Sequence, residues 1–210
     1  MKSLIVPAII AKSQNELEKM LQRVIGKVER VQLDIMDGDF VPNKSLDFDF
    51  EIPYDFEYEA HLMVKHPFKW IDKIVNKVDI ITVHVESIKD IEKVIDYVTK
   101  EGKKINLALI PETKYPTVKD YMGIIDGILV MTVDPGSYCI NKEFNPKTLQ
   151  KIRQLREIDS TISIEVDGCM NPENARLTKN AGANIFASGS YIFKSENVDR
   201  ALKELKDAIS

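Results

Sequence analysis

The sequence predicts a single-domain α/β protein in which strands and helices alternate. Eight short apolar runs are spread along the chain, and stretches with helical periodicity follow most of them. The runs are apolar throughout, which is typical of parallel strands that are buried on both faces. We expect one domain over residues 1–210, because this length suffices for one sizeable core. A (β/α)8 barrel and an open doubly wound sheet share this pattern, and periodicity alone leaves both open.

Each predicted strand is a short apolar run bounded by polar or turn-forming residues. In chain order the strands are predicted at Leu4–Ile10, Val31–Ile35, Tyr58–Val64, Ile80–Val85, Ile105–Ile110, Gly127–Val133, Ile162–Val166 and Asn184–Ala187. One unit is irregular, because residues 43–57 are rich in Asp, Phe and Pro and lack a helical stripe. We therefore expect the second helix to be shortened or missing. Whether this segment contacts another subunit is left open.

The helices are predicted from capping residues and apolar faces. Ser13 and Glu16 have the spacing of a capping box at the start of the first helix. Further helices are predicted to start at Ser87, at Asn145-Pro146 and at Asn171-Pro172, and the last to span about Val198–Ile209. Helical connections of this kind are what neighbouring parallel strands require.

Composition and charge exclude several classes of protein. Hydrophobic residues make up 44% and charged residues 30% of the chain, which is ordinary for a globular protein. The net charge is −4 and the basic residues are dispersed, so nucleic acid is not an expected partner. The first apolar run is short and contains Pro7, which favours a strand over a signal peptide or a membrane span. A membrane is therefore not an expected partner either.

The chain has two cysteines, Cys139 and Cys169, and their spacing matches no metal-binding motif. Two cysteines in 210 residues do not make a disulfide scaffold. We therefore expect a reducing, cytoplasmic environment. Cys169 is interpreted as a small packing residue rather than a reactive thiol.

In barrels of parallel strands, the functional groups lie where the strands end. The predicted strands end in Gln32–Gly38, His61–Met63, His84–Glu86, Met131–Gly136, Asp167-Gly168 and Ser188–Ser190. Carboxylates, a histidine and thioethers are thus expected at one mouth. Small residues follow the last two strands, where barrels of this kind commonly hold a phosphate group. His84 and His66 are interpreted as structural or surface residues.

Five motifs at these strand ends occur in an order that resembles one known family. The motifs are Asp34–Gly38 with Phe40–Asn43, His61–Met63, Met131–Val133 with Pro135-Gly136, Val166–Gly168, and Gly189-Ser190 with Phe193. They resemble the ribulose-phosphate 3-epimerase family over about residues 6–193. The resemblance implies a TIM barrel of the ribulose-phosphate-binding type, and so favours the closed barrel over the open sheet.

The resemblance implies an isomerase of pentose phosphate metabolism that acts on a small phosphorylated sugar. The reaction would invert carbon 3 of a ketopentose phosphate, converting D-ribulose 5-phosphate to D-xylulose 5-phosphate. Asp34 and Asp167 are implied as the catalytic pair. One removes the carbon-3 proton and the other returns a proton to the opposite face, through an enediolate. A homo-oligomer is a further expectation from the resemblance.

The resemblance also implies a cofactor and a set of binding residues. A divalent metal ion (zinc, iron, manganese or cobalt) would be held by Asp34, His61 and Asp167, with position 32 as the fourth ligand. The residues implied to line the substrate are Met36, Met63, Met131 and Gly136, and those implied to bind its phosphate are Gly168, Cys169, Gly189 and Ser190. The three methionines could equally be core residues.

Four features depart from the family's pattern. Gln32 replaces a histidine ligand, and a glutamine oxygen is a poor substitute for imidazole toward zinc or iron(II). Ala8 replaces a serine, Cys169 replaces a glycine, and residues 137–141 replace a glycine-rich loop. The metal could be held by three strong ligands and one weak one, or the two aspartates could work as an acid–base pair without it.

With these departures, three functions remain open. The first is the ribulose-phosphate epimerase. The second is a related barrel enzyme on another phosphosugar, either an allulose-phosphate epimerase or a decarboxylase of a keto-sugar phosphate. The third is a non-catalytic phosphosugar-binding protein.

Overall fold

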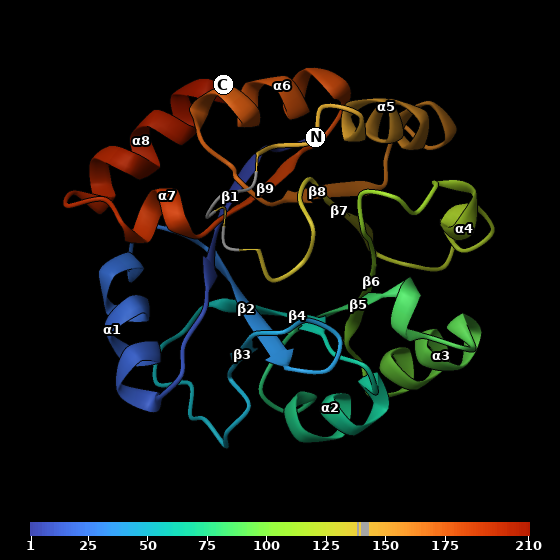
Figure 1. The fold of residues 1–210 in the computed structure, drawn as a ribbon, viewed down its shortest axis with the longest axis horizontal. Helices are drawn as coiled ribbons and strands as arrows, with labels where there is room; N and C mark the ends of the chain where they lie inside the picture. Colours follow the sequence, from blue (N-terminus) through green and yellow to red (C-terminus); the bar gives the residue numbers. More distant parts are fainter. Residues whose placement is uncertain (138, 140–142) are drawn as a thin grey trace.

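A computed structural model of the protein contains a closed barrel of parallel strands (Figure 1). It describes residues 1–137, 139 and 143–210. The barrel strands are β1 Leu4–Ile9, β2 Arg30–Asp37, β4 Glu57–Met63, β5 Ile80–His84, β6 Lys104–Leu109, β7 Gly127–Met131, β8 Ser163–Asp167 and β9 Ile185–Ser188. Strand β1 pairs in parallel with both β2 and β9, which closes the barrel. The predicted (β/α)8 barrel is therefore confirmed, and the open sheet is excluded.

The helices lie around the outside of the barrel (Figure 1). They are α1 Gln14–Val24, α2 Pro67–Ile74, α3 Ile91–Lys100, α4 Pro116–Lys119, α5 Thr148–Ile158, α6 Pro172–Ala181, α7 Ser190–Phe193 and α8 Val198–Ala208, with a 3-10 turn, η1, at Val85–Ser87. Among the described residues, no helix is both long and apolar enough to span a membrane.

Two predicted helix starts are confirmed and two are wrong. The Ser13 hydroxyl accepts a hydrogen bond from the Glu16 amide at 3.3 Å, and Asn171 caps α6 in the same way. The start predicted at Ser87 is wrong, because Ser87 belongs to the 3-10 turn and Asp90 caps α3 instead. The start predicted at Asn145-Pro146 is early, because a turn precedes α5.

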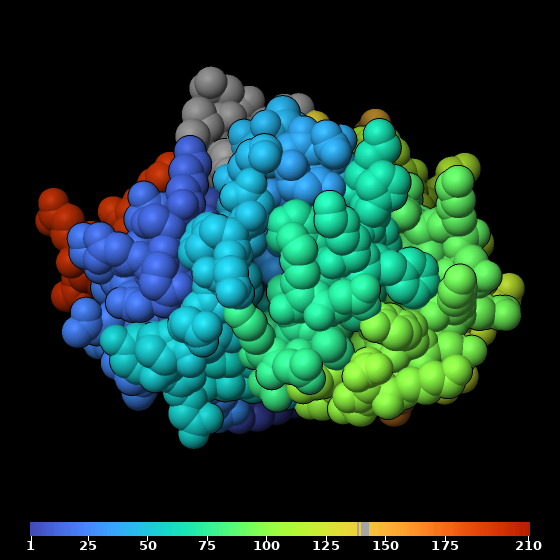
Figure 2. Space-filling view, turned by 90° about the horizontal axis from the view of Figure 1, so that it is seen from below, coloured from blue at the N-terminus to red at the C-terminus, as the bar shows by residue number. Residues whose placement is uncertain are grey.

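The segment between β2 and β4 contains no helix, as the sequence predicts. It includes the short strand β3 Lys44–Ser45, which pairs antiparallel with the end of β2. Leu46 and Phe50 then fill the space beside the barrel, since both are buried. In Figure 2 this segment, in light blue and cyan, lies between the blue N-terminal part and the green part of the chain. Buried apolar side chains thus take the place of the missing helix.

Every second residue of a barrel strand faces the barrel interior. Polar side chains form one layer of this interior, below the carboxyl ends of the strands. Glu59 accepts hydrogen bonds from Thr82 at 2.5 Å and Asn106 at 3.3 Å, and pairs with Arg30 at 3.4 Å. Glu165 is 1% exposed, and neither carboxyl oxygen has a hydrogen-bond partner among the described residues. Burial, followed by the charge of Glu59, raises the pKa of Glu165 well above its ordinary value. Burial therefore favours the protonated form of Glu165, which lies beside the Glu59 that contacts Arg30.

This buried acid gives a prediction for stability. Below the ordinary carboxyl pKa of 4.5, folded and unfolded states both hold the Glu165 proton. As pH rises above that value, only the unfolded state releases it, so stability falls until the folded pKa is passed. Glu165→Gln cannot undergo this loss, and we expect it to gain about 1–3 kcal/mol over the wild type at pH 8.

The measurement is urea unfolding of both proteins at pH 4, 6 and 8. The advantage of Glu165→Gln should grow steadily with pH. Glu196→Gln removes an exposed carboxylate and should give a difference that does not change with pH. A pH-independent difference for Glu165→Gln would contradict the protonated state.

Candidate active site

Four side chains from three strands meet at the carboxyl end of the barrel. Gln32 and Asp34 lie on β2, His61 on β4 and Asp167 on β8. The Gln32 amide nitrogen donates to Asp34 Oδ1 and to Asp167 Oδ2, both at 2.7 Å. His61 Nδ1 lies 3.2 Å from Asp34 Oδ1 and 3.3 Å from Asp167 Oδ2. One amide group therefore joins the two carboxylates, and one imidazole nitrogen faces both.

A second histidine, His84, contacts the other ring nitrogen of His61 and determines that this nitrogen carries a hydrogen. His61 Nε2 is 2.9 Å from His84 Nε2, and His84 Nδ1 is 3.2 Å from Glu86 Oε2. The other Glu86 oxygen accepts the Ile110 amide at 3.0 Å. Because a carboxylate only accepts, His84 Nδ1 bears a hydrogen. Burial lowers the pKa of His84 to about 4, so His84 is neutral and its Nε2 accepts from His61.

The charges of the cluster follow from burial and from these contacts. Burial raises the pKa of Asp34 to about 6 against the opposing hydrogen bond from His61. Burial alone would lower the pKa of His61, but hydrogen bonds to Asp167 and Asp34 outweigh it and raise the pKa to about 10. A positive charge between the two carboxylates is thus favoured, supplied here by the His61 proton.

The same atoms fit a divalent metal ion. Asp34, His61 and Asp167 each offer one ligand atom, and these atoms lie within 4.8 Å of one another. Atoms at ordinary ligand distance from a tetrahedral ion are about 3.4 Å apart, close to the two separations at His61 Nδ1. Gln32 Oε1 is buried and has no partner among the described residues. Half a turn of the Gln32 amide would exchange its nitrogen for this oxygen and supply a fourth, hard ligand.

The two carboxylates form part of the wall of a pocket of ≈ 310 Å³ at the barrel mouth. Its lining includes the residues predicted to contact substrate or phosphate, namely Asp34, Met36, Met63, Met131, Gly136, Asp167, Gly168, Cys169, Gly189 and Ser190. Ala8 also lines it, whereas Gln32 and His61 are fully buried and do not. The sequence-predicted residues are therefore brought together around one cavity.

Two contributions were missed by sequence reasoning. Lys194 lines the pocket and is the only lysine or arginine among the described residues that do so. Its position directly after Phe193 and one turn after Gly189-Ser190 was the available signal. His84 was interpreted as a structural or surface residue. It is fully buried, so it is not a surface residue, and its structural role includes a contact to His61 that the sequence reasoning did not give. Its spacing of two residues from Glu86 was the signal there.

Gly168 has a conformation and a setting that only glycine fits. Its φ is +110°, and a Cβ at this position would lie 2.5 Å from the Val133 side chain. A larger residue would therefore displace the chain after β7, which forms one wall of the pocket. The close approach of these two loops explains the glycine directly after Asp167.

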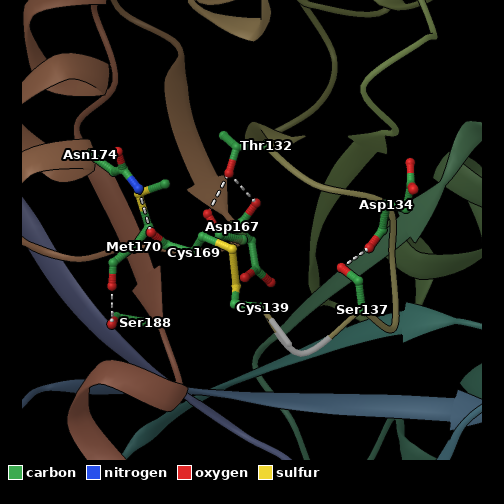
Figure 3. The surroundings of a disulfide bond; sticks show 10 residues. Thr132, Asp134, Ser137, Cys139, Asp167, Cys169, Met170, Asn174 and Ser188 are labelled. Carbon is green, nitrogen blue, oxygen red and sulfur yellow. Dashed lines mark hydrogen bonds between the residues drawn. A yellow bond between two sulfur atoms is a disulfide. The ribbon is translucent and has the colours of Figure 1, made fainter. Parts of the chain in front are cut away.

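The two cysteines are joined by a disulfide, contrary to the expectation of unpaired thiols (Figure 3). Their Cα atoms are 5.4 Å apart, and 30 positions separate them in sequence. Cys139 follows β7 and Cys169 follows β8, and both line the pocket. The expectation failed because spacing along a chain does not report which strand ends become neighbours in a closed barrel.

Comparison with known proteins agrees with this geometry. Residues 4–193 match the family model described as "Ribulose-phosphate 3 epimerase family". The chain belongs to the ribulose-phosphate 3-epimerase family. An enzyme of that name from Chlamydia muridarum is 33% identical over 186 residues, covering 83% of this chain and 81% of the relative. One from Methanocaldococcus jannaschii is 34% identical over 196 residues, covering 86% of this chain and 80% of the relative.

Solved structures show the same fold at low sequence identity. KGPDC from Streptococcus mutans has a TM-score of 0.68 and 14% identity, covering 99% of this chain and 97% of the other. The 3-hexulose-6-phosphate synthase from Salmonella typhimurium has a TM-score of 0.68 and 13% identity, covering 98% of each chain. These similarities support the barrel, and the family itself is established by sequence.

Proposed function

We propose that this member of the epimerase family interconverts D-ribulose 5-phosphate and D-xylulose 5-phosphate by inverting carbon 3. The observation that supports this most is the pair of carboxylates, Asp34 and Asp167, that one Gln32 amide holds at the pocket wall. Inversion through a planar intermediate needs one proton acceptor and one proton donor on opposite faces. Asp34 and Asp167 come from β2 and β8, which β1 and β9 separate in the barrel, so the two carboxylates can approach a substrate from different directions.

In this proposal the carboxylates exchange roles with each direction of reaction. One takes the carbon-3 proton and the other gives a proton to the opposite face. The apolar walls formed by Met36, Met63 and Met131 keep water from the intermediate, because all three side chains are nearly or fully buried. When no metal ion is bound, the Gln32 hydrogen bonds keep the two carboxylates at a fixed separation.

A divalent ion would be held by Asp34, His61, Asp167 and the Gln32 oxygen. When bound, it would neutralise the negative charge that develops on the substrate oxygens. Three oxygen ligands and one nitrogen favour a harder ion than zinc, so we propose manganese as the better fit. The His84 contact keeps His61 Nδ1 directed at the site.

The phosphate group would bind where the loops after β8 and β9 meet. Gly168, Cys169, Gly189 and Ser190 line that side of the pocket, together with Lys194. Backbone amides and one cation are a common environment for a phosphate. The positive Lys194 side chain would add to the backbone contacts.

The test uses one preparation that is divided into a chelated and a manganese-supplemented half. Both halves are assayed with ribulose 5-phosphate, with allulose 6-phosphate and with a 3-keto-sugar-acid phosphate. We expect turnover of ribulose 5-phosphate in the supplemented half alone. Equal turnover in both halves would support an acid–base pair without a metal. Turnover of another substrate alone, or of none, would overturn the proposed reaction.

The His84 contact gives a further prediction. His84→Leu removes the acceptor for His61 Nε2–H, so His61 can direct either nitrogen toward the carboxylates. We expect manganese affinity to fall about tenfold, as when a partner behind a metal ligand is lost. His66→Leu, at an exposed histidine without a cap hydrogen bond, is the matched control and should bind as the wild type does. Calorimetric titration with manganese measures both, and unchanged affinity in His84→Leu would contradict this role.

A further inference from the structure

We propose that Cys139 and Cys169 form a redox-modification site whose bridged state strengthens phosphate binding in the pocket. The substrate part of this inference rests on the proposed function. The existence of the site and its effect on the binding of inorganic phosphate do not depend on that function.

The bridge lies where it can affect ligand binding. It connects the loop after β7 to the loop after β8, and both cysteines line the pocket beside the catalytic carboxylate Asp167 (Figure 3). Both residues are partly exposed, so a small reagent dissolved in water can reach them. A change at this bond therefore acts on two walls of the substrate site together.

The backbone at both cysteines has an unusual conformation. The φ angle is +53° at Cys139 and +52° at Cys169, in the left-handed region that non-glycine residues disfavour. A free cysteine would tend to leave this conformation. The covalent bond between the two loops opposes that tendency at both positions.

The loop after β8 is also held from the side away from the pocket. Asn174 donates to the Cys169 carbonyl at 2.7 Å, and Ser188 donates to the Met170 carbonyl at 2.8 Å. Thr132 donates to the Gly168 carbonyl. These hydrogen bonds hold the loop on one side, and the bridge ties Cys169 to the loop after β7 on the other. Breaking the bridge should loosen the backbone that faces the phosphate.

The chemistry is thiol–disulfide exchange with a low-molecular-weight disulfide. One cysteine thiolate attacks that disulfide, forms a mixed disulfide and releases one small thiolate. The second cysteine thiolate then attacks the protein sulfur and releases the second small thiolate. The two cysteines lose two electrons and the small disulfide gains them. A small dithiol reverses the reaction.

The first experiment determines whether the site exists. Protein is treated with an oxidised or a reduced small thiol, alkylated, and digested for peptide mass analysis. We expect a linked Cys139–Cys169 peptide after oxidation and two alkylated cysteines after reduction. Two alkylated cysteines under both conditions would overturn the proposal, whatever reaction the protein performs.

The second experiment measures binding of inorganic phosphate, and KM for ribulose 5-phosphate where turnover exists. We expect reduction to lower the affinity for inorganic phosphate about tenfold and to raise KM about tenfold. The reason is that the left-handed backbone conformation is no longer enforced once the bridge is broken. Cys139→Ser should bind as weakly as reduced wild type and should not respond to reductant.

A double variant separates the backbone effect from simple loss of the bond. Cys139→Ser with Cys169→Gly has no bridge, but glycine adopts a φ near +52° without strain. We expect it to recover most of the affinity that Cys139→Ser loses. Equal affinity of oxidised and reduced wild type, or no recovery in the double variant, would overturn the proposal. The measurement of inorganic phosphate binding tests the proposal even if the protein does not convert ribulose 5-phosphate.

Discussion

Asp34→Asn and Asp167→Asn should each lower net conversion of ribulose 5-phosphate at least about 1000-fold, which is the effect expected for loss of a proton-transfer group. An amide cannot accept the carbon-3 proton, and it is also a weaker metal ligand than a carboxylate. The remaining carboxylate can still remove a proton from the epimer that faces it and return one to the same face. Each variant should therefore retain carbon-3 exchange with one epimer only, and the two variants should prefer opposite epimers.

The measurement follows deuterium uptake from heavy water into ribulose 5-phosphate and, separately, xylulose 5-phosphate. Asp39→Asn changes an exposed carboxylate shortly after the same strand and serves as the control, with both activities retained. If both amide variants exchange both epimers equally, the carboxylates do not act on opposite faces. If either variant keeps full net conversion, that residue is not a proton donor or acceptor.

Gln32→His should strengthen zinc binding by about tenfold to a hundredfold. The two side chains are similar in size, and Gln32 is fully buried next to the other ligands. An imidazole nitrogen is a better zinc ligand than an amide oxygen, which explains the direction of the change. Competition with a chelator of known affinity measures the effect for zinc and for manganese. The gain should be larger for zinc, because manganese is the harder ion.

Gln32→Leu is the comparison variant. It fills similar space but removes both hydrogen bonds that join Asp34 to Asp167. The wild type also needs added metal, but this variant lacks the fourth ligand and the amide that joins the carboxylates. We therefore expect it to need a higher manganese concentration than the wild type for half-maximal turnover. Zinc affinity in Gln32→His no greater than in the wild type would contradict the placement of residue 32 as the fourth ligand.

Much of the site could be predicted because strand ends are visible in the sequence. Asp34, His61 and Asp167 each lie at the end of an apolar run, and a parallel barrel brings such ends to one mouth. The missing second helix was also visible, as a segment without helical periodicity. Each of these inferences needs only local pattern and the rule that parallel strands share an end.

The remaining features depend on contacts between strands that no local pattern reports. The Gln32 amide bridges to a residue 135 positions away, and its role as a donor was not visible from its place on β2. His84 contacts His61 through its Nε2 atom, and it lies in a run that the sequence presents as an ordinary buried strand. The Cys139–Cys169 bridge depends on the closed barrel itself. These features follow from the register of neighbouring strands, which the sequence alone leaves open.

The most direct measurement is carbon-3 hydrogen exchange in the unmodified protein. Manganese-supplemented protein is incubated with ribulose 5-phosphate in heavy water and followed by proton NMR. We expect deuterium at carbon 3 of both the xylulose 5-phosphate formed and the ribulose 5-phosphate recovered. Absence of deuterium in both sugars, in protein that binds manganese at Asp34, His61 and Asp167, would contradict the proposed epimerase.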